Sequence, residues 1–394
     1  MKGNYTATCC ASLQAIFGNK TILPSTPAYQ SSLTSYFSAQ AAAIHPACIV
    51  APESAADVAS AVQLLTGESS CLQDEIDGNY RPFAVRSGGH ATQADAANID
   101  GGVTIDLRRL NSIEVSPDRS TVAIGAGNTW DHVYSHLDPA NLCVNGGRTA
   151  DVGVGGLVIN SVDAYDEYAA LTLTWGYSPE VGAIVSSNME YTKETENPPV
   201  FAGLAGLPKL FGESQMSNMT QLAIDLRNQQ VRGQRQFWAT HTFASTEAAL
   251  NVTHSHFHDE FLPTIQSVPD IVVGYTMEPL PPALYAKHTD QNVLGLDNRS
   301  GSLVISLLTV SWTESTDDER VQNAGRALIE AIDKGLKEIG AHDPFVYLNY
   351  AAPWQDPIAS YGPGNVEKLR KVADEVDPHE VFARQVPGGF KIQR

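Results

Sequence analysis

The chain has no long uninterrupted hydrophobic run. Its longest apolar stretches, such as residues 303–310, are far shorter than the roughly 20 apolar residues with which a helix crosses a bilayer. We therefore expect no membrane-spanning helix and no membrane partner.

Positively charged side chains are also few. The 394 residues include 25 lysines and arginines against 44 aspartates and glutamates, which gives a formal net charge of −19 at pH 7. A surface this negative repels the phosphate backbone of nucleic acids and anionic lipid headgroups. We therefore exclude nucleic acid as a partner, while the charge itself says nothing about the substrate.

Cysteine is scarce, and its spacing does not favour a metal site. Adjacent cysteines and long gaps do not easily assemble the tetrahedral ligand set that zinc requires. Four of the five cysteines lie in the first 71 residues, where two disulfides could tie an N-terminal segment, residues 1–40, to the first folded unit. The five are Cys9, Cys10, Cys48, Cys71 and Cys143. We predict disulfides and no metal.

The chain carries five sequons for N-linked glycosylation. They begin at Asn4, Asn19, Asn218, Asn251 and Asn298. Together with the clustered cysteines they predict a secreted glycoprotein, since disulfides persist in oxidising compartments. Residues 1–20 lack the apolar core of a signal peptide, so either the sequence is that of the mature protein or its true start is missing.

What the sequence does contain is typical of a globular protein with about two domains. Hydrophobic residues make up 43% and charged residues 18%, and the chain is longer than one compact core usually allows. The first part alternates strand and helix, and Ser54 and Asp57 have capping-box spacing before one helix. The expected elements are strands over 46–52, 83–86 and 103–107, a helix over 55–65, and hairpin strands over 112–115 and 121–124.

The pattern changes after Leu157, where longer strands with intervening helices begin. We expect strands over 169–175, 182–191, 237–243, 271–277, 303–312 and 345–350. Thr316 and Glu319 have capping-box spacing before the clearest helix. Its apolar stripe comprises Val321, Ala324, Leu328, Ala331, Ile332 and Ile339. This part predicts an antiparallel sheet with helices on one face, and hence an α+β protein.

The segment Arg86-Ser87-Gly88-Gly89-His90 follows an expected strand and carries the most chemical information. Consecutive glycines let the backbone turn tightly and point several N–H groups at one anion, so a pyrophosphate can approach closely. The alternative is an ordinary tight turn at the surface. The pair of glycines alone does not decide between the two.

In its context this segment resembles the flavin-attachment loop of FAD-linked oxidoreductases of the berberine-bridge-enzyme-like family. Further motifs of the family follow in order along most of the chain. They lie at 124–127, 146–148, 152–157, 347–350, 361–362, 377–378, Phe382 and 386–390. The resemblance implies a PCMH-type FAD-binding domain over 41–157, a substrate domain over 158–342, and a C-terminal segment, 343–394, that returns to the FAD domain.

The resemblance also implies a set of site residues. His90 would bond covalently to the flavin 8α-methyl group, Asn349 would touch the cofactor, and Cys71 would pair with Cys9 or Cys10. The cofactor-binding residues so implied are Arg86, Ser87, Gly88, Gly89, His90, Gly147, Gly153, Gly155, Gly156 and Asn349. Tyr350 is the candidate catalytic base. The alternative for Tyr350 is a packed aromatic residue whose hydroxyl is already hydrogen-bonded.

One departure from the family stands out. After the glycine run at 152–157 the family continues with more glycines and a Tyr-Gly-x-x-Cys-Asp-type segment, whereas here residues 158–165 already resemble the substrate domain. The FAD domain is therefore incomplete, and the second, cysteinyl flavin bond is absent. Cys143 precedes the glycine run and cannot replace that cysteine. The gene model has lost an exon, the protein is a degenerate relative, or the fold works without redox chemistry.

Three functions follow from these observations. The first is an FAD-dependent oxidase or dehydrogenase of a small hydroxylated or secondary-metabolite substrate, with hydride passing to flavin N5 and O2 as the electron acceptor. The second is an isomerase or cyclase on the same fold without flavin, or an inactive relic. The third is a glycoprotein that binds without catalysis. Bound flavin distinguishes the first from the others.

Three alternating histidines raise the question of a metal site. On a strand, His254, His256 and His258 would share one face, whereas on a helix successive ones point in different directions. The stretch after Ser245 has a helical pattern, so we predict no metal here.

Overall fold

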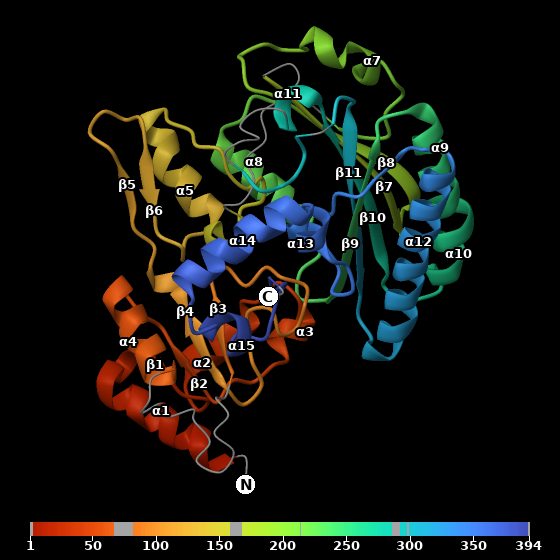
Figure 1. The fold of residues 1–394 in the computed structure, drawn as a ribbon. Helices are drawn as coiled ribbons and strands as arrows, with labels where there is room; N and C mark the ends of the chain where they lie inside the picture. The colour runs from red at the N-terminus through yellow and green to blue at the C-terminus, as the bar shows by residue number, and fades with distance from the viewer. Residues whose placement is uncertain are drawn as a thin grey trace. The chain divides into compact units, whose positions relative to one another are not determined.

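The computed structural model describes residues 3–66, 82–157, 168–212, 214–285, 292–297 and 299–392. It divides into two compact units (Figure 1). Unit 1 comprises Met1–Ser161, Asn218–Gln234 and Arg370–Arg394, and unit 2 comprises Val162–Ser217 and Arg235–Leu369. Both units combine helices with a sheet, which confirms the α+β class. The sequence placed boundaries near 157 and 342, whereas unit 1 also takes in the two later segments.

Unit 1 is built on a four-stranded sheet of the described residues, in the order β1-β2-β4-β3. The strands are β1 (Thr21–Ile22), β2 (Cys48–Val50), β3 (Phe83–Arg86) and β4 (Val103–Asp106). β2 and β3 run parallel to β4, and helix α4 (Ala55–Thr66) follows β2. At its start the Ser54 hydroxyl accepts from the Asp57 N–H at 3.1 Å, as the capping box predicts. The Asp57 carboxylate, however, accepts from the backbone of Glu53 and not of Ser54.

A second layer of unit 1 consists of the hairpin β5 (Ile113–Val115) and β6 (Val122–Ile124), with helices α5 (Trp130–Leu137) and α8 (Met219–Asn228). α8 belongs to the segment 218–234, which lies far along the chain. It nevertheless joins this core, because Ala223 is buried among α5 side chains. The Ala150 N–H also donates to the Ala223 carbonyl at 3.0 Å. No local pattern in the sequence predicts this return.

Of the C-terminal segment, 343–394, only Arg370–Arg394 belongs to unit 1, whereas residues 343–369 belong to unit 2. Helix α14 (Pro363–Val376) is followed by α15 (Val381–Arg384), and the Phe83 N–H donates to the Gln385 carbonyl at 2.7 Å. Val381 and Val386 pack against the apolar core around β2, β3 and β4. The last residues thereby cover the strand that leads to His90.

A disulfide joins Cys10, in helix α1 (Gly3–Phe17), to Cys48 in β2. Cys9 is disulfide-bonded as well. Cys71, for which Cys9 and Cys10 were alternative partners, lies outside the described residues. The bond to Cys48 rules out Cys10 as that partner, because a cysteine sulfur forms only one disulfide.

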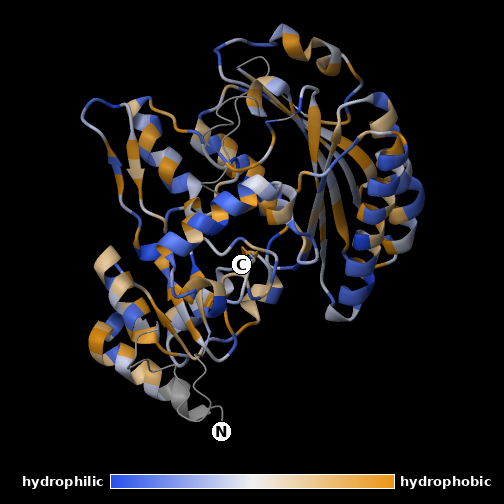
Figure 2. Cartoon of the chain, in the orientation of Figure 1, coloured by the Kyte–Doolittle hydropathy of each residue, from blue (hydrophilic) through white to orange (hydrophobic). Residues whose placement is uncertain are grey.

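Unit 2 contains a six-stranded antiparallel sheet of the described residues, in the order β12-β9-β11-β10-β7-β8. The strands are β7 (Ala169–Ser178), β8 (Gly182–Tyr191), β9 (Arg235–Ala244), β10 (Val272–Leu280), β11 (Leu303–Trp312) and β12 (His342–Asp343). One face packs against α9 (Glu247–Ser255), a π-helical turn (His256–Phe261), α10 (Leu262–Ile265) and α12 (Asp318–Glu338) (Figure 1). Figure 2 shows hydrophilic residues along the outer side of α12. The predicted antiparallel sheet with helices on one face is confirmed.

Three local predictions in unit 2 are wrong. Residues 345–350 form no strand, because the Asp343 carboxylate accepts from the Phe345 N–H at 2.9 Å and turns the chain into a 3₁₀ turn, Leu348–Tyr350. The capping box before α12 does not form, since a 3₁₀ turn, Ser315–Asp317, precedes that helix. Ile339 is 46% exposed because α12 has ended one residue earlier.

Within the described part of the chain, no helix is both long enough and apolar enough to span a membrane.

Candidate functional site

The loop from Arg86 to His90 is closed by contacts with a second glycine-rich loop. A Cβ added to Gly88 would lie 2.7 Å from the Cα of Gly153, and one on Gly155 would lie 2.8 Å from the Ser87 hydroxyl. Gly89 has φ +77°, a conformation that residues with a side chain rarely adopt. The glycines therefore let two distant backbone segments touch, and the predicted residues of both loops come together in unit 1.

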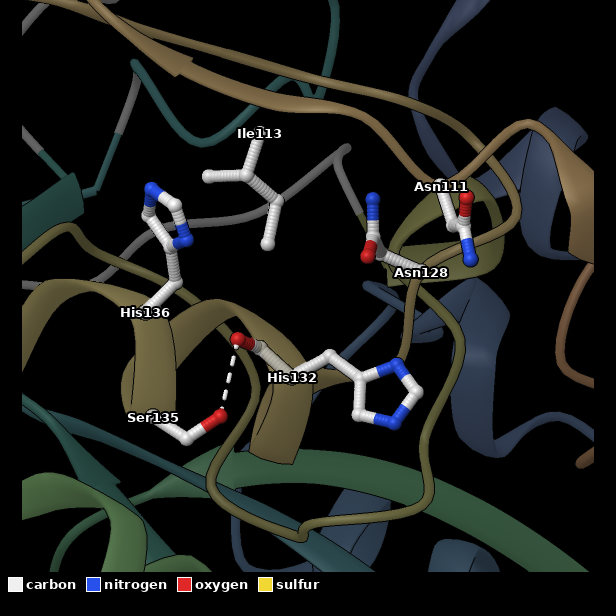
Figure 3. Close-up of a pocket in the computed structure, with 6 residues that line it drawn as sticks. All are labelled: Asn111, Ile113, Asn128, His132, Ser135 and His136. Atoms are coloured by element: carbon white, nitrogen blue, oxygen red, sulfur yellow. Dashed lines mark hydrogen bonds between the residues drawn. The ribbon is translucent and has the colours of Figure 1, made fainter.

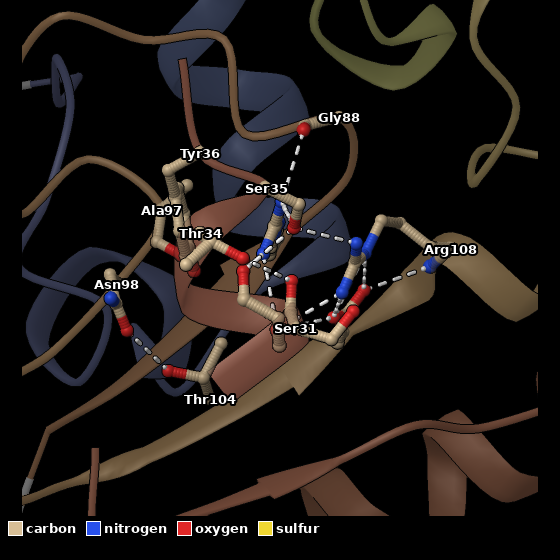
Figure 4. A network of polar contacts seen from close by, with 12 residues as sticks. Ser31, Thr34, Ser35, Tyr36, Gly88, Ala97, Asn98, Thr104 and Arg108 are labelled. Atoms are coloured by element: carbon tan, nitrogen blue, oxygen red, sulfur yellow. Dashed lines mark hydrogen bonds and ion pairs between the residues drawn. The ribbon is translucent and has the colours of Figure 1, made fainter. Parts of the chain in front are cut away.

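The Arg86 side chain is buried beneath the loop and stabilises it, and it does not point into solvent. Its side chain is fully buried, and its guanidinium donates to the Ser32 carbonyl at 2.9 Å and to the Gly88 carbonyl at 3.4 Å. It also lies 3.7 Å from the centre of the Tyr36 ring. Figure 4 shows the network around Ser35, Tyr36 and Gly88.

Asp106, at the end of β4, supplies the carboxylate of this network. Arg108 donates to it through Nε at 2.9 Å and through the terminal nitrogen at 2.6 Å. Ser32 and Ser35 connect both arginines to it. The Ser32 hydroxyl lies 3.3 Å from the Asp106 carboxylate, and the Ser35 hydroxyl accepts from Arg86 and Arg108. Figure 4 labels Ser35 and Arg108 of this network. Burial alone would raise the pKa of Asp106, but the hydrogen bond and charge of Arg108 and the charge of Arg86 hold it below its usual value.

His90 is enclosed by three neighbours in unit 1. Its ring stacks on Phe37, with centroids 4.0 Å apart, and its Nε2 lies 3.8 Å from Oδ2 of Asp151. The same carboxylate oxygen lies 3.0 Å from the guanidinium of Arg232. Burial lowers the pKa of His90, and Asp151 only partly opposes that effect. The imidazole is therefore neutral near pH 7, which is the form that can act as a nucleophile.

Tyr350 lies in unit 2 and forms a pair with a carboxylate. Its hydroxyl donates to Glu278 in β10 at 2.9 Å, and its ring meets Trp238 edge-on with centroids 6.2 Å apart. The Asn349 amide donates to the Tyr347 hydroxyl at 3.0 Å. This cluster lies on the side of the sheet that the long helices leave uncovered, since the residues facing α12 alternate with Trp238 and Glu278 along their strands.

The remaining predicted residues have structural contacts as well. The Gly147 carbonyl accepts from the Tyr134 hydroxyl at 2.9 Å, and Ser87 donates to the Ala126 carbonyl at 2.6 Å. Gly156 lies in the short helix α6 (Val154–Leu157) that follows Gly153. Unit 1 thus contains all the predicted cofactor residues except Asn349, which lies with Tyr350 in unit 2.

Four neighbours of these residues were not predicted, namely Phe37, Asp151, Arg232 and Glu278. Asp151 precedes Gly153 in the glycine run by two positions, and its carboxyl group was a signal that could have been noticed. Glu278 interrupts an apolar strand, which is a weaker signal of the same kind. No sequence pattern around Phe37 or Arg232 indicates a role at this site, because both residues come near His90 only when distant segments fold together.

A cavity of about 330 Å³ lies elsewhere in unit 1, beside α5 (Figure 3). Its lining comprises Asn111, Ile113, Asn128, His132, Ser135 and His136, none of which is a predicted site residue.

Across the described ranges no group of three or more histidine, cysteine, aspartate or glutamate side chains could hold a metal ion. His254 and His258 stack on each other along the helical stretch of unit 2, and His256 pairs with Glu260 at 2.9 Å.

The residues of unit 1 fit a flavin by the chemistry of their donors. A neutral, largely buried imidazole stands at the end of a glycine-rich turn, as a histidyl attachment point requires. Gly88 and Gly153 pack so closely against each other that neither could carry a side chain. Packing within the protein therefore already explains why these two residues are glycines. The fit therefore rests on His90 and its surroundings more than on the glycines.

Comparison with known proteins agrees with this chemistry. Residues 46–170 match the family described as FAD binding domain. FAD-dependent monooxygenase drtC of Aspergillus calidoustus is 28% identical over 484 positions, covering 98% of this chain and 91% of that protein. FAD-dependent monooxygenase sdcF of Emericella nidulans is 28% identical over 487 positions, covering 98% of each. Both alignments exceed the 394 residues of the chain, so these relatives contain residues without a counterpart here.

A third relative is much longer. Oligopeptidase PhomG' of Diaporthe leptostromiformis is 31% identical over 460 positions, which cover 96% of this chain but only 37% of that protein. The chain therefore spans little more than a third of that relative.

Solved structures show the same fold at low identity. 6-hydroxy-D-nicotine oxidase from Arthrobacter nicotinovorans has a TM-score of 0.72 at 16% identity, covering 95% of this chain and 97% of that one. BBE-like 1 of Physcomitrella patens has a TM-score of 0.67 at 12% identity, covering 98% and 99%. The chain thus contains a segment that matches an FAD binding domain, resembles FAD-dependent monooxygenases over nearly its whole length, and shares the fold of 6-hydroxy-D-nicotine oxidase and BBE-like 1.

Proposed function

We propose that the chain is an FAD-dependent oxidase or dehydrogenase whose flavin is attached covalently through His90. The observation that carries this proposal is the neutral imidazole of His90, stacked on Phe37 and held beside Asp151 at the end of the glycine turn. In its neutral form the ring keeps a nitrogen lone pair for bond formation. The loop around it is stiffened by the buried Arg86 network, which limits how far the ring can move.

The proposed roles of the other loop residues differ. Gly88, Gly153 and Gly155 let the two loops pack against each other. The backbone N–H groups of these residues and of Gly89, Gly147 and Gly156 are the proposed contacts of a pyrophosphate. Arg86 and Ser87 hold the turn in shape through the Gly88 and Ala126 carbonyls. Asn349 is the proposed contact from unit 2. Bound FAD would supply the acceptor for the hydride that leaves the substrate.

Tyr350 is the proposed acceptor of the substrate proton. Its hydroxyl already donates to Glu278 at 2.9 Å, so the carboxylate can take the phenol proton as the phenol oxygen accepts one from a substrate hydroxyl. Trp238 packs edge-on against the Tyr350 ring and restricts its rotation. The same hydrogen bond is what the alternative, a packed aromatic residue with its hydroxyl satisfied, requires. The proposal rests on the partner being a carboxylate, which can act as a base.

The proposed substrate is a small hydroxylated or secondary-metabolite compound. The side of the unit 2 sheet opposite α12 carries hydroxyl groups that suit such a molecule, including the half-buried Thr174 and Thr276, whose hydroxyls lie 2.9 Å apart. Among the structural neighbours are a xylooligosaccharide oxidase in complex with xylobiose and a glycopeptide hexose oxidase. These names, and those of the monooxygenases, support O2 as the electron acceptor.

The test is the visible absorbance of the purified protein before and after acid precipitation. We expect wild-type flavin to stay with the pellet and His90→Ala to release all of its flavin into the supernatant, because the only proposed covalent bond is lost. His45→Ala is the matched control, since His45 is an exposed histidine of the same unit.

Covalent flavin in the His90→Ala protein, detected by mass spectrometry, would refute the attachment. A colourless wild-type protein that takes up no added FAD would refute the redox function altogether. It would leave the flavin-less isomerase or cyclase, or an inactive relic, as the remaining function of this fold.

We further propose that the protein passes through the secretory pathway as a glycoprotein. The Cys10–Cys48 disulfide and the exposed sequon residues Asn19, Asn218 and Asn251 support this proposal. Protein secreted by its native host should lose mass on treatment with an endoglycosidase, and each occupied sequon changed to glutamine should remove one step of that loss. An unchanged mass would contradict glycosylation.

A further inference from the structure

Strand β8 lies at one edge of the unit 2 sheet, and its outer side pairs with no other strand of the described residues. Its inner side pairs with β7 at all ten positions from Gly182 to Tyr191, in one unbroken register. A long edge strand of this kind presents a row of backbone N–H and C=O groups with which another strand can pair. Natural proteins protect such edges with charged residues, a proline, a bulge or a covering segment.

The opposite edge of the same sheet has this protection. It ends in β12, a strand of only two residues, which pairs with β9. Further along β9, the Gln355 side chain covers the edge, because its amide accepts from the Thr240 N–H at 3.2 Å and donates to the Thr240 carbonyl. The contrast between the two edges indicates that β8 is an edge left open for a partner.

The sequence of β8 suits pairing of the strand with itself. From Gly182 to Met189 it contains no charged residue and no proline. In an antiparallel pair of identical strands, charged side chains of one sign would lie close together and repel. Since each chain carries a net charge of −19, two copies repel unless they meet through an uncharged surface. A basic partner, by contrast, would find no acidic side chain to recognise along this stretch.

Apolar side chains near this edge are uncovered as well. Val185 is 68% exposed, although its register partner Trp175 packs against the core of unit 2. The segment 199–212 begins beside β8, because the Phe201 ring packs against the Tyr191 ring with centroids 6.5 Å apart. The strand and this segment together supply roughly the 20 to 30 residues that a stable interface uses on each side. Their other exposed large apolar residues, with that of the adjoining turn, are Val181, Val200, Leu207, Leu210 and Phe211.

We propose that β8 is the interface through which two copies of this chain form a dimer. The two β8 strands pair antiparallel about a two-fold axis near Val185, in the middle of the uncharged stretch, so that the sheets of both copies join into one. Each copy contributes the same surface, as a two-fold interface requires. The open backbone groups of the edge gain partners, and the two Val185 side chains come together and leave water.

The test is the mass of the full-length protein in solution, measured by sedimentation velocity over a range of concentrations. We expect the wild type to have the mass of two chains. Val185→Lys should raise the dissociation constant of the dimer at least about 100-fold, because the burial of a valine is lost in both copies. Ile339→Lys is the matched control and should leave the mass unchanged, since Ile339 is an exposed apolar residue of unit 2 at the end of α12.

A mixture of two variants tests the position of the two-fold axis. Val185→Glu should weaken the dimer for the same reason as Val185→Lys. Equal amounts of the two variants mixed together should dimerise more strongly than either variant alone, because opposite charges then lie close to each other across the axis. Such recovery also shows that both variant proteins are folded.

Three results would overturn the proposal. The first is a wild type that stays monomeric at every concentration. The second is a dimer that Val185→Lys leaves intact or that Ile339→Lys weakens equally. The third is a pair of monomeric Val185 variants whose mixture gains no dimer, which would exclude a two-fold axis near this residue.

Discussion

Tyr350→Phe is expected to slow reduction of the bound flavin by substrate at least about 100-fold, with little change in substrate affinity. Removing a positioned proton acceptor typically costs 10²- to 10⁴-fold in rate. The ring of Tyr350 keeps its packing against Trp238 and Tyr347 in the variant, so the loss is confined to the hydroxyl and its hydrogen bond to Glu278. Stopped-flow absorbance of the flavin in anaerobic mixtures measures the rate directly.

Two further variants make this result interpretable. Glu278→Gln keeps a hydrogen-bond acceptor for the Tyr350 hydroxyl but removes the negative charge, and it should also slow reduction. Tyr285→Phe removes another phenol hydroxyl of unit 2, one that donates to the Gly301 carbonyl at 2.7 Å, and should leave reduction unchanged. An unaltered reduction rate in Tyr350→Phe would remove Tyr350 from the mechanism.

Asp106→Asn is expected to lower the free energy of unfolding by about 3–5 kcal/mol, the usual cost of leaving a buried charge without its partner. Asp106 is 3% exposed and is the carboxylate that balances the guanidinium groups of Arg86 and Arg108 in this network. Asparagine keeps the volume but not the charge. Urea unfolding at pH 7 gives the difference, and Asp100→Asn, at an exposed position of the same unit, should change it little.

The pH dependence of this difference follows from the lowered pKa of Asp106. A carboxyl whose folded-state pKa lies below its unfolded value of about 3.9 stabilises the protein fully above that value. The stabilisation disappears as the pH falls through the folded-state pKa. The gap between wild type and Asp106→Asn should therefore be constant above about pH 5 and shrink below pH 4. A gap that persisted unchanged into acid would mean that the charge of Asp106 is not its source.

The two predictions differ in how much of their basis is visible in the sequence. Tyr350 follows from a motif near the C-terminus, but its partner Glu278 lies 72 residues away on a strand with an ordinary apolar pattern. In the sequence, Asp106 is only the last residue of a predicted strand. Its network with the buried arginines forms through Ser32 of helix α2 (Pro27–Thr34) and Ser35, the C-cap of that helix. The strand pattern gives no sign of these contacts.

Local patterns in the sequence by themselves determined much of this protein. Apolar patterns predicted every strand of the two larger sheets except the two-residue strands β1 and β12. The helical period predicted the buried stripe of α12, and the Ser54–Asp57 spacing predicted the start of α4. Each of these patterns depends on residues within a few positions of one another. The order of short glycine motifs indicated the resemblance to FAD-linked oxidoreductases and made His90 the candidate attachment residue in the same local way.

Tertiary structure alone decided the surroundings of these residues. The return of 218–234 to unit 1 brings Arg232 to Asp151, the disulfide joins Cys10 to Cys48, and the β10 register brings Glu278 to Tyr350. The error at 345–350 has the same origin, since a hydrogen bond to Asp343 overrode the strand pattern there. Contacts between distant segments form by burial and charge pairing in three dimensions, and no periodicity along one sequence specifies which distant partner a side chain meets.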